Sequence, residues 1–163
     1  MARQQASLVL ISNSPTETFC IGRSLGEGLM GGDCVALTGE LGAGKTCLTQ
    51  GIAAGLGVPD SYVVASPTFT LVNEYPGKDT SLYHLDVYRL RGSADLEEIG
   101  YQEYLMSDGV MVIEWAEKVA DAIPDDALNV ELSYVDETVR KIEISGCPDR
   151  IRSWERTFKQ GGS

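Results

Sequence analysis

The stretch "GELGAGKT", residues 39–46, is the most informative segment of this sequence. It matches the Walker A pattern G-x-x-x-x-G-K-[ST] in full. The apolar run "DCVALT" before it predicts a buried strand, and "TCLTQGIAAGL" after it predicts a helix. A glycine-rich loop between a strand and a helix is the context in which this motif binds nucleotide phosphates. We therefore expect an α/β, three-layer fold of the P-loop NTPase type.

The residue types in this loop indicate how phosphates would be held. Glycines at 39, 42 and 44 allow the backbone to turn its N–H groups inward, and the helix N-terminus adds partial positive charge. Lys45 is expected to reach the β- and γ-phosphates, and the Thr46 hydroxyl to bind Mg²⁺. The guanine signature Asn-Lys-x-Asp is absent from the sequence, which favours ATP. The predicted nucleotide-binding residues of the loop are Glu40, Leu41, Gly42, Ala43, Gly44, Lys45 and Thr46.

Length and charge limit the remaining possibilities. The 163 residues suit one domain spanning 1–163, and no apolar run approaches the ~20 residues of a membrane span. A cytoplasmic protein that does not enter a membrane is therefore expected. The formal net charge of −11 disfavours direct binding to nucleic acid, because a phosphodiester backbone repels such a surface.

The rest of the chain alternates strand and helix patterns. Two β-rich runs flank Pro76-Gly77, which predicts an antiparallel hairpin and hence a mixed parallel and antiparallel sheet. "ALNVELSYV" and "TVRKIEIS" predict a second antiparallel pair. Ser14 is expected to cap a first helix that begins at Pro15, and Ser93 to cap another.

A basic helix is expected at about 148–159, with two interpretations. Ile151, Trp154 and Phe158 fall on one stripe, which would close the core. A second stripe carries Arg152, Arg156 and Lys159, as a docking face for an anionic partner would.

Two carboxylates at strand ends are candidates for the chemistry that a phosphate loop needs. Glu114 ends "GVMVIE", a Walker B-like strand, and is expected to serve Mg²⁺. Asp86 ends "SLYHLD" and is expected to have a catalytic role or a link to the metal. His84 shares a strand face with Asp86, although a lone histidine is more often structural than a base. Trp115 either packs in the core or rests against the loop or the nucleotide.

The segment "SPTFTLVNEY" carries two hydroxyls, Thr68 and Thr70, soon after the first P-loop helix. P-loop proteins often place a nucleotide-sensing segment at this point. A plain entry into the hairpin remains the alternative.

In this order, "GELGAGKT", "SPTFTLVNEY", "HLDVYRL", "DLEEIGYQEYL" and "VIEWAE" resemble the bacterial tRNA threonylcarbamoyladenosine biosynthesis ATPase family, TsaE (YjeE). The resemblance implies a small P-loop ATPase that binds ATP and Mg²⁺ and hydrolyses ATP weakly alone. It also implies action with the TsaD and TsaB proteins in threonylcarbamoylation of adenosine 37 in tRNA. Contact with tRNA would then be indirect, through the complex.

The resemblance also assigns roles to individual positions. It implies catalytic roles for Lys45 and Asp86, and Mg²⁺ binding by Thr46 and Glu114. It places Thr68 in a switch-like segment at the nucleotide, with Trp115 following the glutamate.

Two other functions stay open on the residues alone. A small-molecule P-loop kinase would need an arginine-rich lid, for which Arg89 and Arg91 are the nearest candidates. A nucleotide-gated binding module would use ATP to order residues 66–75, with hydrolysis incidental.

Overall fold

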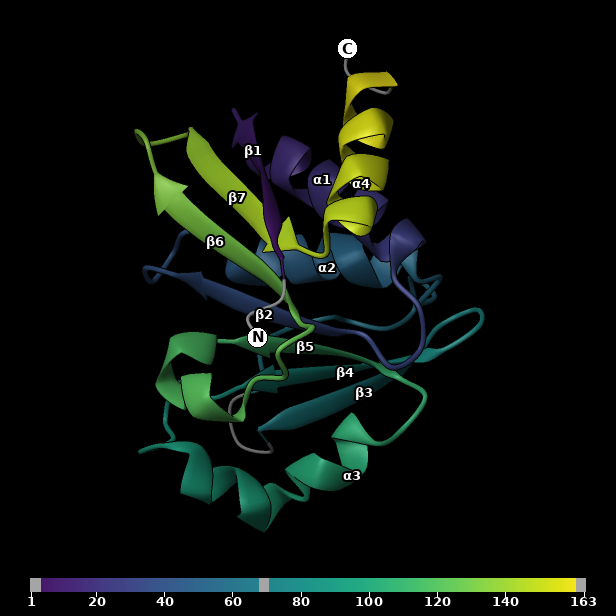
Figure 1. The fold of residues 1–163 in the computed structure, drawn as a ribbon, viewed down its shortest axis with the longest axis vertical. Helices are drawn as coiled ribbons and strands as arrows, with labels where there is room; N and C mark the ends of the chain where they lie inside the picture. The colour runs from purple at the N-terminus through teal and green to yellow at the C-terminus, as the bar shows by residue number, and fades with distance from the viewer. Residues whose placement is uncertain (1–3, 68–70, 161–163) are drawn as a thin grey trace.

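The computed structural model describes residues 4–67 and 71–160, which fold around one sheet (Figure 1). The seven strands lie in the order β1-β7-β6-β2-β5-β4-β3. They are β1 (Ala6–Ser12), β2 (Cys34–Gly39), β3 (Val72–Pro76), β4 (Ser81–Asp86), β5 (Val110–Glu114), β6 (Leu128–Tyr134) and β7 (Arg140–Gly146). The α-helices are α1 (Pro15–Gly28), α2 (Lys45–Gly55), α3 (Tyr101–Leu105) and α4 (Pro148–Gln160), and the 3₁₀ helices are η1 (Ser93–Ile99) and η2 (Ala116–Ala122).

The sheet is mixed, as the sequence predicts. Strand β2 runs parallel to both β5 and β6, and β4 runs parallel to β5. The pairs β3–β4, β6–β7 and β1–β7 are antiparallel. The predicted hairpin turns after Pro76, where the Gly77 amide donates to the Thr80 carbonyl at 3.0 Å. Parallel β2, β4 and β5 end at the same edge of the sheet, which brings their terminal residues together.

Helices cover the two faces of the sheet in three layers. One core cluster joins α1, α2 and α4 to the sheet, through buried residues such as Leu25, Ile52 and Trp154. The other cluster places η1, α3 and η2 against the opposite face, through residues such as Leu96 and Val119. Every residue of β5 is buried, since this central strand is covered on both sides. The three-layer α/β prediction is confirmed.

Glycines bring α1 and α2 into backbone contact. A Cβ added at Gly22 would lie 2.3 Å from the Leu48 carbonyl oxygen, and one at Gly51 would lie 2.1 Å from that of Phe19. Gly26 and Gly55 make equally close contacts one turn further along. No larger residue fits these four positions without separating the helices. Helix α1 is thereby fixed against the helix that follows the phosphate loop.

The predicted helix starts differ in outcome. Ser14 caps α1, since its Oγ accepts from the Glu17 amide at 3.1 Å, and Pro15 is the first helical residue. The prediction that Ser93 caps a helix was wrong. Gly92 precedes η1 without a side-chain cap, and the Ser93 hydroxyl instead bonds to Asp121 of η2. The hydrogen bond to Asp121 takes the place of the expected bond to the backbone at the start of η1.

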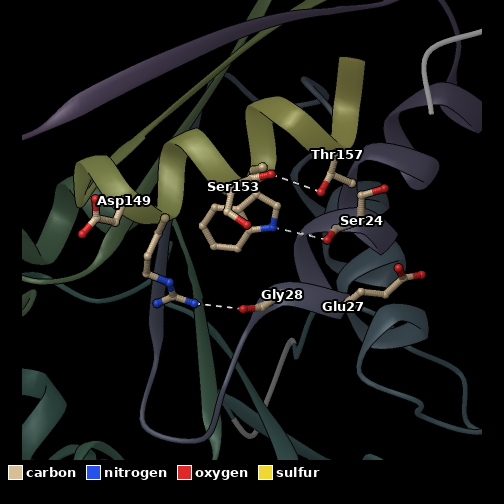
Figure 2. A pocket seen from close by; sticks show the side chains of 8 residues that line it. Ser24, Glu27, Gly28, Asp149, Ser153 and Thr157 are labelled. Carbon is tan, nitrogen blue, oxygen red and sulfur yellow. Dashed lines mark hydrogen bonds between the residues drawn. The ribbon is translucent and has the colours of Figure 1, made fainter. Parts of the chain in front are cut away.

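Helix α4 is fastened to α1 by polar contacts (Figure 2). The Trp154 indole N–H donates to the Ser24 carbonyl at 3.3 Å. The Arg150 guanidinium bonds to both carboxylate oxygens of Asp33 at 2.8 Å and to the Gly28 carbonyl at 3.0 Å. A cavity of about 320 Å³ lies along this joint. Ile151 and Trp154 are buried in the core, so the apolar stripe of α4 closes it.

Candidate nucleotide and cation site

The phosphate loop, residues 39–46, links the end of β2 to the start of α2. Gly39, Gly42 and Gly44 all have positive φ, at 146°, 81° and 107°. A Cβ at Gly42 would lie 2.6 Å from the Tyr134 hydroxyl, so a side chain there would displace that ring. That hydroxyl donates to the Leu41 carbonyl at 2.9 Å, which ties the loop to β6. The glycines thus have the backbone geometry that a phosphate cradle requires.

Lys45 is held within the loop that it belongs to. Its ammonium donates to the carbonyls of Gly39 at 2.5 Å and Glu40 at 2.9 Å. It also lies 3.8 Å from the centroid of the Trp115 ring, at cation–π distance. Burial lowers the pKa of Lys45, and the nearby carboxylate of Glu114 opposes that shift. The Lys45 ammonium is therefore a hydrogen-bond donor that lies beside the loop with little access to water.

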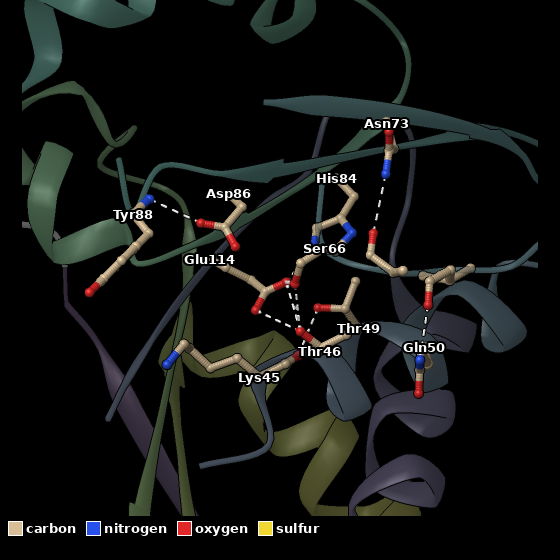
Figure 3. A network of polar contacts seen from close by, with 12 residues as sticks. Lys45, Thr46, Thr49, Gln50, Ser66, Asn73, His84, Asp86, Tyr88 and Glu114 are labelled. Atoms are coloured by element: carbon tan, nitrogen blue, oxygen red, sulfur yellow. Dashed lines mark hydrogen bonds and ion pairs between the residues drawn. The ribbon is translucent and has the colours of Figure 1, made fainter. Parts of the chain in front are cut away.

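Glu114 is the hub of a polar network at the ends of β4 and β5 (Figure 3). Only 2% exposed, it receives hydrogen bonds from the Thr46 hydroxyl at 3.1 Å and the Ser66 hydroxyl at 3.2 Å. Thr46 Oγ1 and Ser66 Oγ are themselves 2.8 Å apart. His84, fully buried, contacts the Glu114 carboxylate through Nε2. These contacts compensate a buried charge.

Asp86 lies opposite Glu114, one strand further from β2. The two occupy paired positions in the parallel β4–β5 ladder, and Figure 3 shows both carboxylates on the Lys45 side of the sheet edge. The Tyr88 amide donates to Asp86 Oδ1 at 2.9 Å. Burial raises the pKa of Asp86 most strongly, that amide opposes the shift, and the Glu114 charge adds to it. Burial and the neighbouring carboxylate thus both disfavour the ionised form of Asp86.

Trp115 lies against the loop. It is one of two described non-glycine residues with positive φ, at 63°. Its ring centroid lies 4.8 Å from that of Tyr88 and 3.8 Å from the Lys45 ammonium. A left-handed backbone is uncommon for a bulky residue, and here it turns the indole from the end of β5 toward the phosphate loop. Both interpretations for Trp115 apply, since the ring contacts Lys45 of the loop and also packs, partly buried, against the core cluster that includes Leu85 and Ile113.

Several cavities border the loop, among them one of about 440 Å³ beside Gly39, Glu40 and Trp115. Two others share part of their lining with each other. The first, of about 380 Å³, lies between the loop and the carboxylates. The second, of about 200 Å³, lies on the α1 side and shares Gly42, Gly44 and Cys47 with the first. The first is lined by Leu41, Gly42, Gly44, Lys45, Thr46, Cys47, Ser66, Asp86, Tyr88, Glu114 and Trp115. The second is lined by Ser14, Pro15, Thr18, Gly42, Ala43, Gly44, Cys47, Glu137, Thr138 and Arg140.

The structure thus brings Lys45, Thr46, Asp86, Glu114 and Trp115 to one cavity. The predicted contact of Thr68 lies outside the described residues. Two features were not predicted from the sequence. One is the contact of Ser66 with Thr46 and Glu114, and the other is the second cavity. Ser66 stood within the quoted segment "SPTFTLVNEY", but no local pattern separated it from the hydroxyls that follow.

The donor set suits Mg²⁺. It offers hard oxygen atoms, two from hydroxyls and the rest from one carboxylate, beside the glycine-rich loop. Among residues 4–67 and 71–160 no group of three or more His, Cys, Asp or Glu side chains has a metal-binding arrangement. Mg²⁺ is commonly bound through one or two carboxylates plus nucleotide phosphates, and these residues fit that mode.

Across the part of the chain that the structure describes, no helix combines the length and apolarity needed to cross a bilayer.

Comparisons with known proteins agree on one family. A family profile described as "Threonylcarbamoyl adenosine biosynthesis protein TsaE" matches residues 12–142. The tRNA threonylcarbamoyladenosine biosynthesis protein TsaE of Treponema pallidum is 42% identical over 135 residues, covering 83% of this chain and 98% of that protein. The protein of the same name from Bacillus subtilis is 36% identical over 137 residues, covering 84% of each.

The fold agrees with these matches. The crystal structure of Bacillus subtilis YdiB superposes with a TM-score of 0.80 at 28% identity, covering 99% of this chain and 100% of that one. The motifs from the phosphate loop to Trp115 lie inside the matched residues. On these grounds the chain belongs to the TsaE family.

Proposed function

We propose that this chain is the ATPase component of tRNA threonylcarbamoyladenosine synthesis. It binds ATP with Mg²⁺ at residues 39–46, hydrolyses it slowly and acts with TsaD and TsaB in the cytoplasm. The pathway follows from the names of the relatives, each described as a tRNA threonylcarbamoyladenosine biosynthesis protein. One observation supports the ATPase assignment above all: the Thr46 hydroxyl at the start of α2 lies 3.1 Å from the carboxylate of Glu114.

Phosphate binding is assigned to the loop and Lys45. The start of α2 presents free N–H groups, and the positive φ values of Gly42 and Gly44 leave the loop backbone free of side chains there. Within residues 4–67 and 71–160, the Lys45 ammonium bonds to neutral carbonyl oxygens and lies over the Trp115 face, so an anionic phosphate would be a stronger partner. Glu40, Leu41 and Ala43 complete the loop around the phosphates.

The nucleoside is assigned to the second cavity. If the terminal phosphates lie toward Thr46 and Glu114, the second cavity can receive the other end of the nucleotide across the loop on the α1 side. Ser14, Thr138 and Arg140 line that space and offer hydroxyl and guanidinium groups to a ribose or base. The Cys47 thiol, between the cavities, donates to the Pro15 carbonyl at 3.2 Å.

Hydrolysis is assigned to Asp86 together with Lys45. Among the residues that the structure describes, three side chains contact Glu114, whereas the carboxylate of Asp86 accepts one bond, from the Tyr88 amide. Asp86 therefore keeps lone pairs with which to orient a water and receive its proton. Lys45 would stabilise the negative charge on the transferred phosphoryl group. Mg²⁺, bound by Thr46 and Glu114, would neutralise charge on the phosphates.

The surface charge supports indirect contact with tRNA. A net charge of −11 would repel a nucleic acid, so access to adenosine 37 is assigned to the partner proteins. The kinase alternative gains nothing from Arg91, whose guanidinium is 90% exposed and pairs with Asp95.

Reconstitution tests the proposal. The chain is combined with TsaD, TsaB, tRNA, ATP and threonylcarbamoyl adenylate, and modified tRNA is counted over several turnovers. Lys45→Ala should abolish repeated turnover, whereas Lys141→Ala, at an exposed lysine of β7, should leave it unchanged. Unchanged multi-round modification with Lys45→Ala would reject the assignment.

A second variant separates the ATPase from a nucleotide-gated module. Asp86→Asn should bind ATP and the partner proteins normally but fail to support repeated modification. If modification persists at the wild-type rate while hydrolysis is lost, ATP acts by binding alone.

A further inference from the structure

Ser66 contacts residues that are distant from it in the sequence, and no local sequence pattern predicts these contacts. It lies in the loop after α2, 20 residues beyond Thr46 and 48 before Glu114, yet it touches both. Ser66 Oγ lies 2.8 Å from Thr46 Oγ1 and 3.2 Å from Glu114 Oε2, and Thr46 Oγ1 lies 3.3 Å from the same Oε2. Three oxygen atoms from three separate segments form a nearly equilateral triangle (Figure 3).

The size of this triangle matches one face of a magnesium octahedron. Mg²⁺ holds its oxygen ligands at about 2.0–2.1 Å in octahedral geometry, so neighbouring ligands are separated by roughly 3 Å. The measured sides of 2.8, 3.2 and 3.3 Å lie close to that separation. A cation over this face would keep its other positions for phosphate oxygens and water.

The backbone before Ser66 is tied down on both sides. From α2, the Gln50 side-chain amide donates to the Val64 carbonyl at 2.9 Å. From β3, the Asn73 side-chain amide donates to the Ala65 carbonyl at 3.2 Å, and the Tyr75 hydroxyl accepts from the Ala65 amide at 3.4 Å. These contacts place the Ser66 hydroxyl before any ligand arrives, which reduces the entropy lost on binding.

The Glu114 oxygen of the triangle is held in place by His84. His84 is fully buried and contacts Glu114 at Oε2, the same oxygen that faces the two hydroxyls. Carboxylates that bind metals are themselves commonly held by a further hydrogen bond. His84 thus sets which oxygen of Glu114 completes the triangle.

We propose that Ser66 is the third protein oxygen ligand of the Mg²⁺ site, beside Thr46 and Glu114. This rests on the proposed function, in which those two residues bind the cation. Ligation by Ser66 connects the cation directly to residues 63–66, and so makes this surface loop responsive to Mg²⁺-nucleotide. A hydroxyl that merely donates to Glu114 would have no such link.

The test replaces oxygen by sulfur. Affinity for a fluorescent ATP analogue is measured in EDTA, Mg²⁺ and Cd²⁺ for wild type, Ser66→Ala, Ser66→Thr and Ser66→Cys. Ser61→Cys, at an exposed serine in the same loop, is the matched control. Wild type and this control show how the four natural cysteines respond to Cd²⁺. Thiolate prefers a soft cation, so only a ligating cysteine should favour Cd²⁺.

We expect equal affinities in EDTA for all variants. The increase in nucleotide affinity that Mg²⁺ produces should be about tenfold or more smaller in Ser66→Ala and Ser66→Cys than in wild type. In Ser66→Thr it should be retained. Cd²⁺ should restore the gain in Ser66→Cys alone. A wild-type Mg²⁺ gain in Ser66→Ala, or no Cd²⁺ rescue of Ser66→Cys, overturns the inference while the proposed function stands. If wild type itself gains nothing from Mg²⁺, the proposed cation site fails as well.

Discussion

Asp86 and Glu114 occupy paired positions at the ends of two neighbouring parallel strands, β4 and β5. Their environments differ. Glu114 is 2% exposed and contacts Thr46, Ser66 and His84, whereas Asp86 is partly exposed and accepts the Tyr88 amide. Two nearby carboxylates in different environments can divide their tasks. This contrast supports giving the cation to Glu114 and the attacking water to Asp86.

Replacement of Asp86 by asparagine should therefore separate hydrolysis from binding. Asparagine keeps the shape and the bond from the Tyr88 amide but cannot take a proton. We expect ATP hydrolysis to fall by about 10²-fold or more, with nucleotide affinity within a few-fold of wild type. Phosphate release and equilibrium binding measure the two effects. Asp79→Asn, in the turn between β3 and β4, is the control. Full hydrolysis by Asp86→Asn would remove Asp86 from the chemistry.

The pH dependence of hydrolysis should report the same carboxylate. Burial raises the pKa of Asp86 above its ordinary value of 3.8, and its ionised form is the base. Hydrolysis should therefore fall as the pH is lowered through this raised pKa and recover as the pH rises. The residual rate of Asp86→Asn should lack this acidic limb. Circular dichroism at each pH confirms that the protein stays folded. An identical acidic limb in both proteins would assign it to another group.

The glycine contacts between α1 and α2 predict a stability effect. A methyl group at Gly51 would lie 2.1 Å from the Phe19 carbonyl oxygen, so Gly51→Ala should force the helices apart. Overpacking of this kind costs about 1–3 kcal/mol, more than the helix propensity gained from alanine. Urea unfolding measures the loss. Gly92→Ala is the matched control, because a Cβ there meets nothing within 4 Å. Equal stability of the two variants would show that the helices adjust freely.

The sequence predicted those parts of the fold that local patterns determine. The phosphate loop, the strand before it and the helix after it follow from glycine spacing and apolar runs, and the hairpin follows from Pro76-Gly77. Asp86 and Glu114 end strand-like runs in the sequence, and the parallel pairing of β4 with β5 in the structure brings both to the cavity beside the loop. The spacing Gly22-x-x-x-Gly26 and Gly51-x-x-x-Gly55 is also typical of helices that pack closely against each other, as α1 and α2 do.

Contacts between distant segments were beyond local patterns. Ser66 reaches Thr46 because Gln50, Asn73 and Tyr75 hold the preceding backbone, and no spacing rule encodes that arrangement. Ser93 illustrates the reverse case, in which a good capping residue was recruited by Asp121 from another helix. Long-range hydrogen bonds decide both positions.

Arg150 and Arg152 should differ sharply in their effect on stability, although both lie on α4. The Arg150 guanidinium is partly buried and binds both oxygens of Asp33, whereas Arg152 pairs with an Asp149 side chain that is 86% exposed. Arg150→Ala should destabilise the fold by about 1–3 kcal/mol, because it removes both guanidinium bonds to Asp33 and leaves that carboxylate with its bond from the Met30 amide. Arg152→Ala should change stability by less than about 0.5 kcal/mol. Thermal unfolding compares them, and equal shifts would contradict the role of Arg150 as the anchor of α4.

Trp115 should report nucleotide binding by its fluorescence. The Lys45 ammonium lies 3.8 Å from its ring centroid, and a bound phosphate would draw that charge away from the indole. The chain has two tryptophans, so Trp154→Phe leaves Trp115 as the single emitter. In that variant ATP should change the emission, and the added Lys45→Ala replacement should abolish the change. Trp115→Phe, which retains Trp154 at the distant α1–α4 joint, should stay silent. A response from Trp115→Phe equal to that of Trp154→Phe would mean that the signal arises from a change at α4 rather than at the phosphate loop.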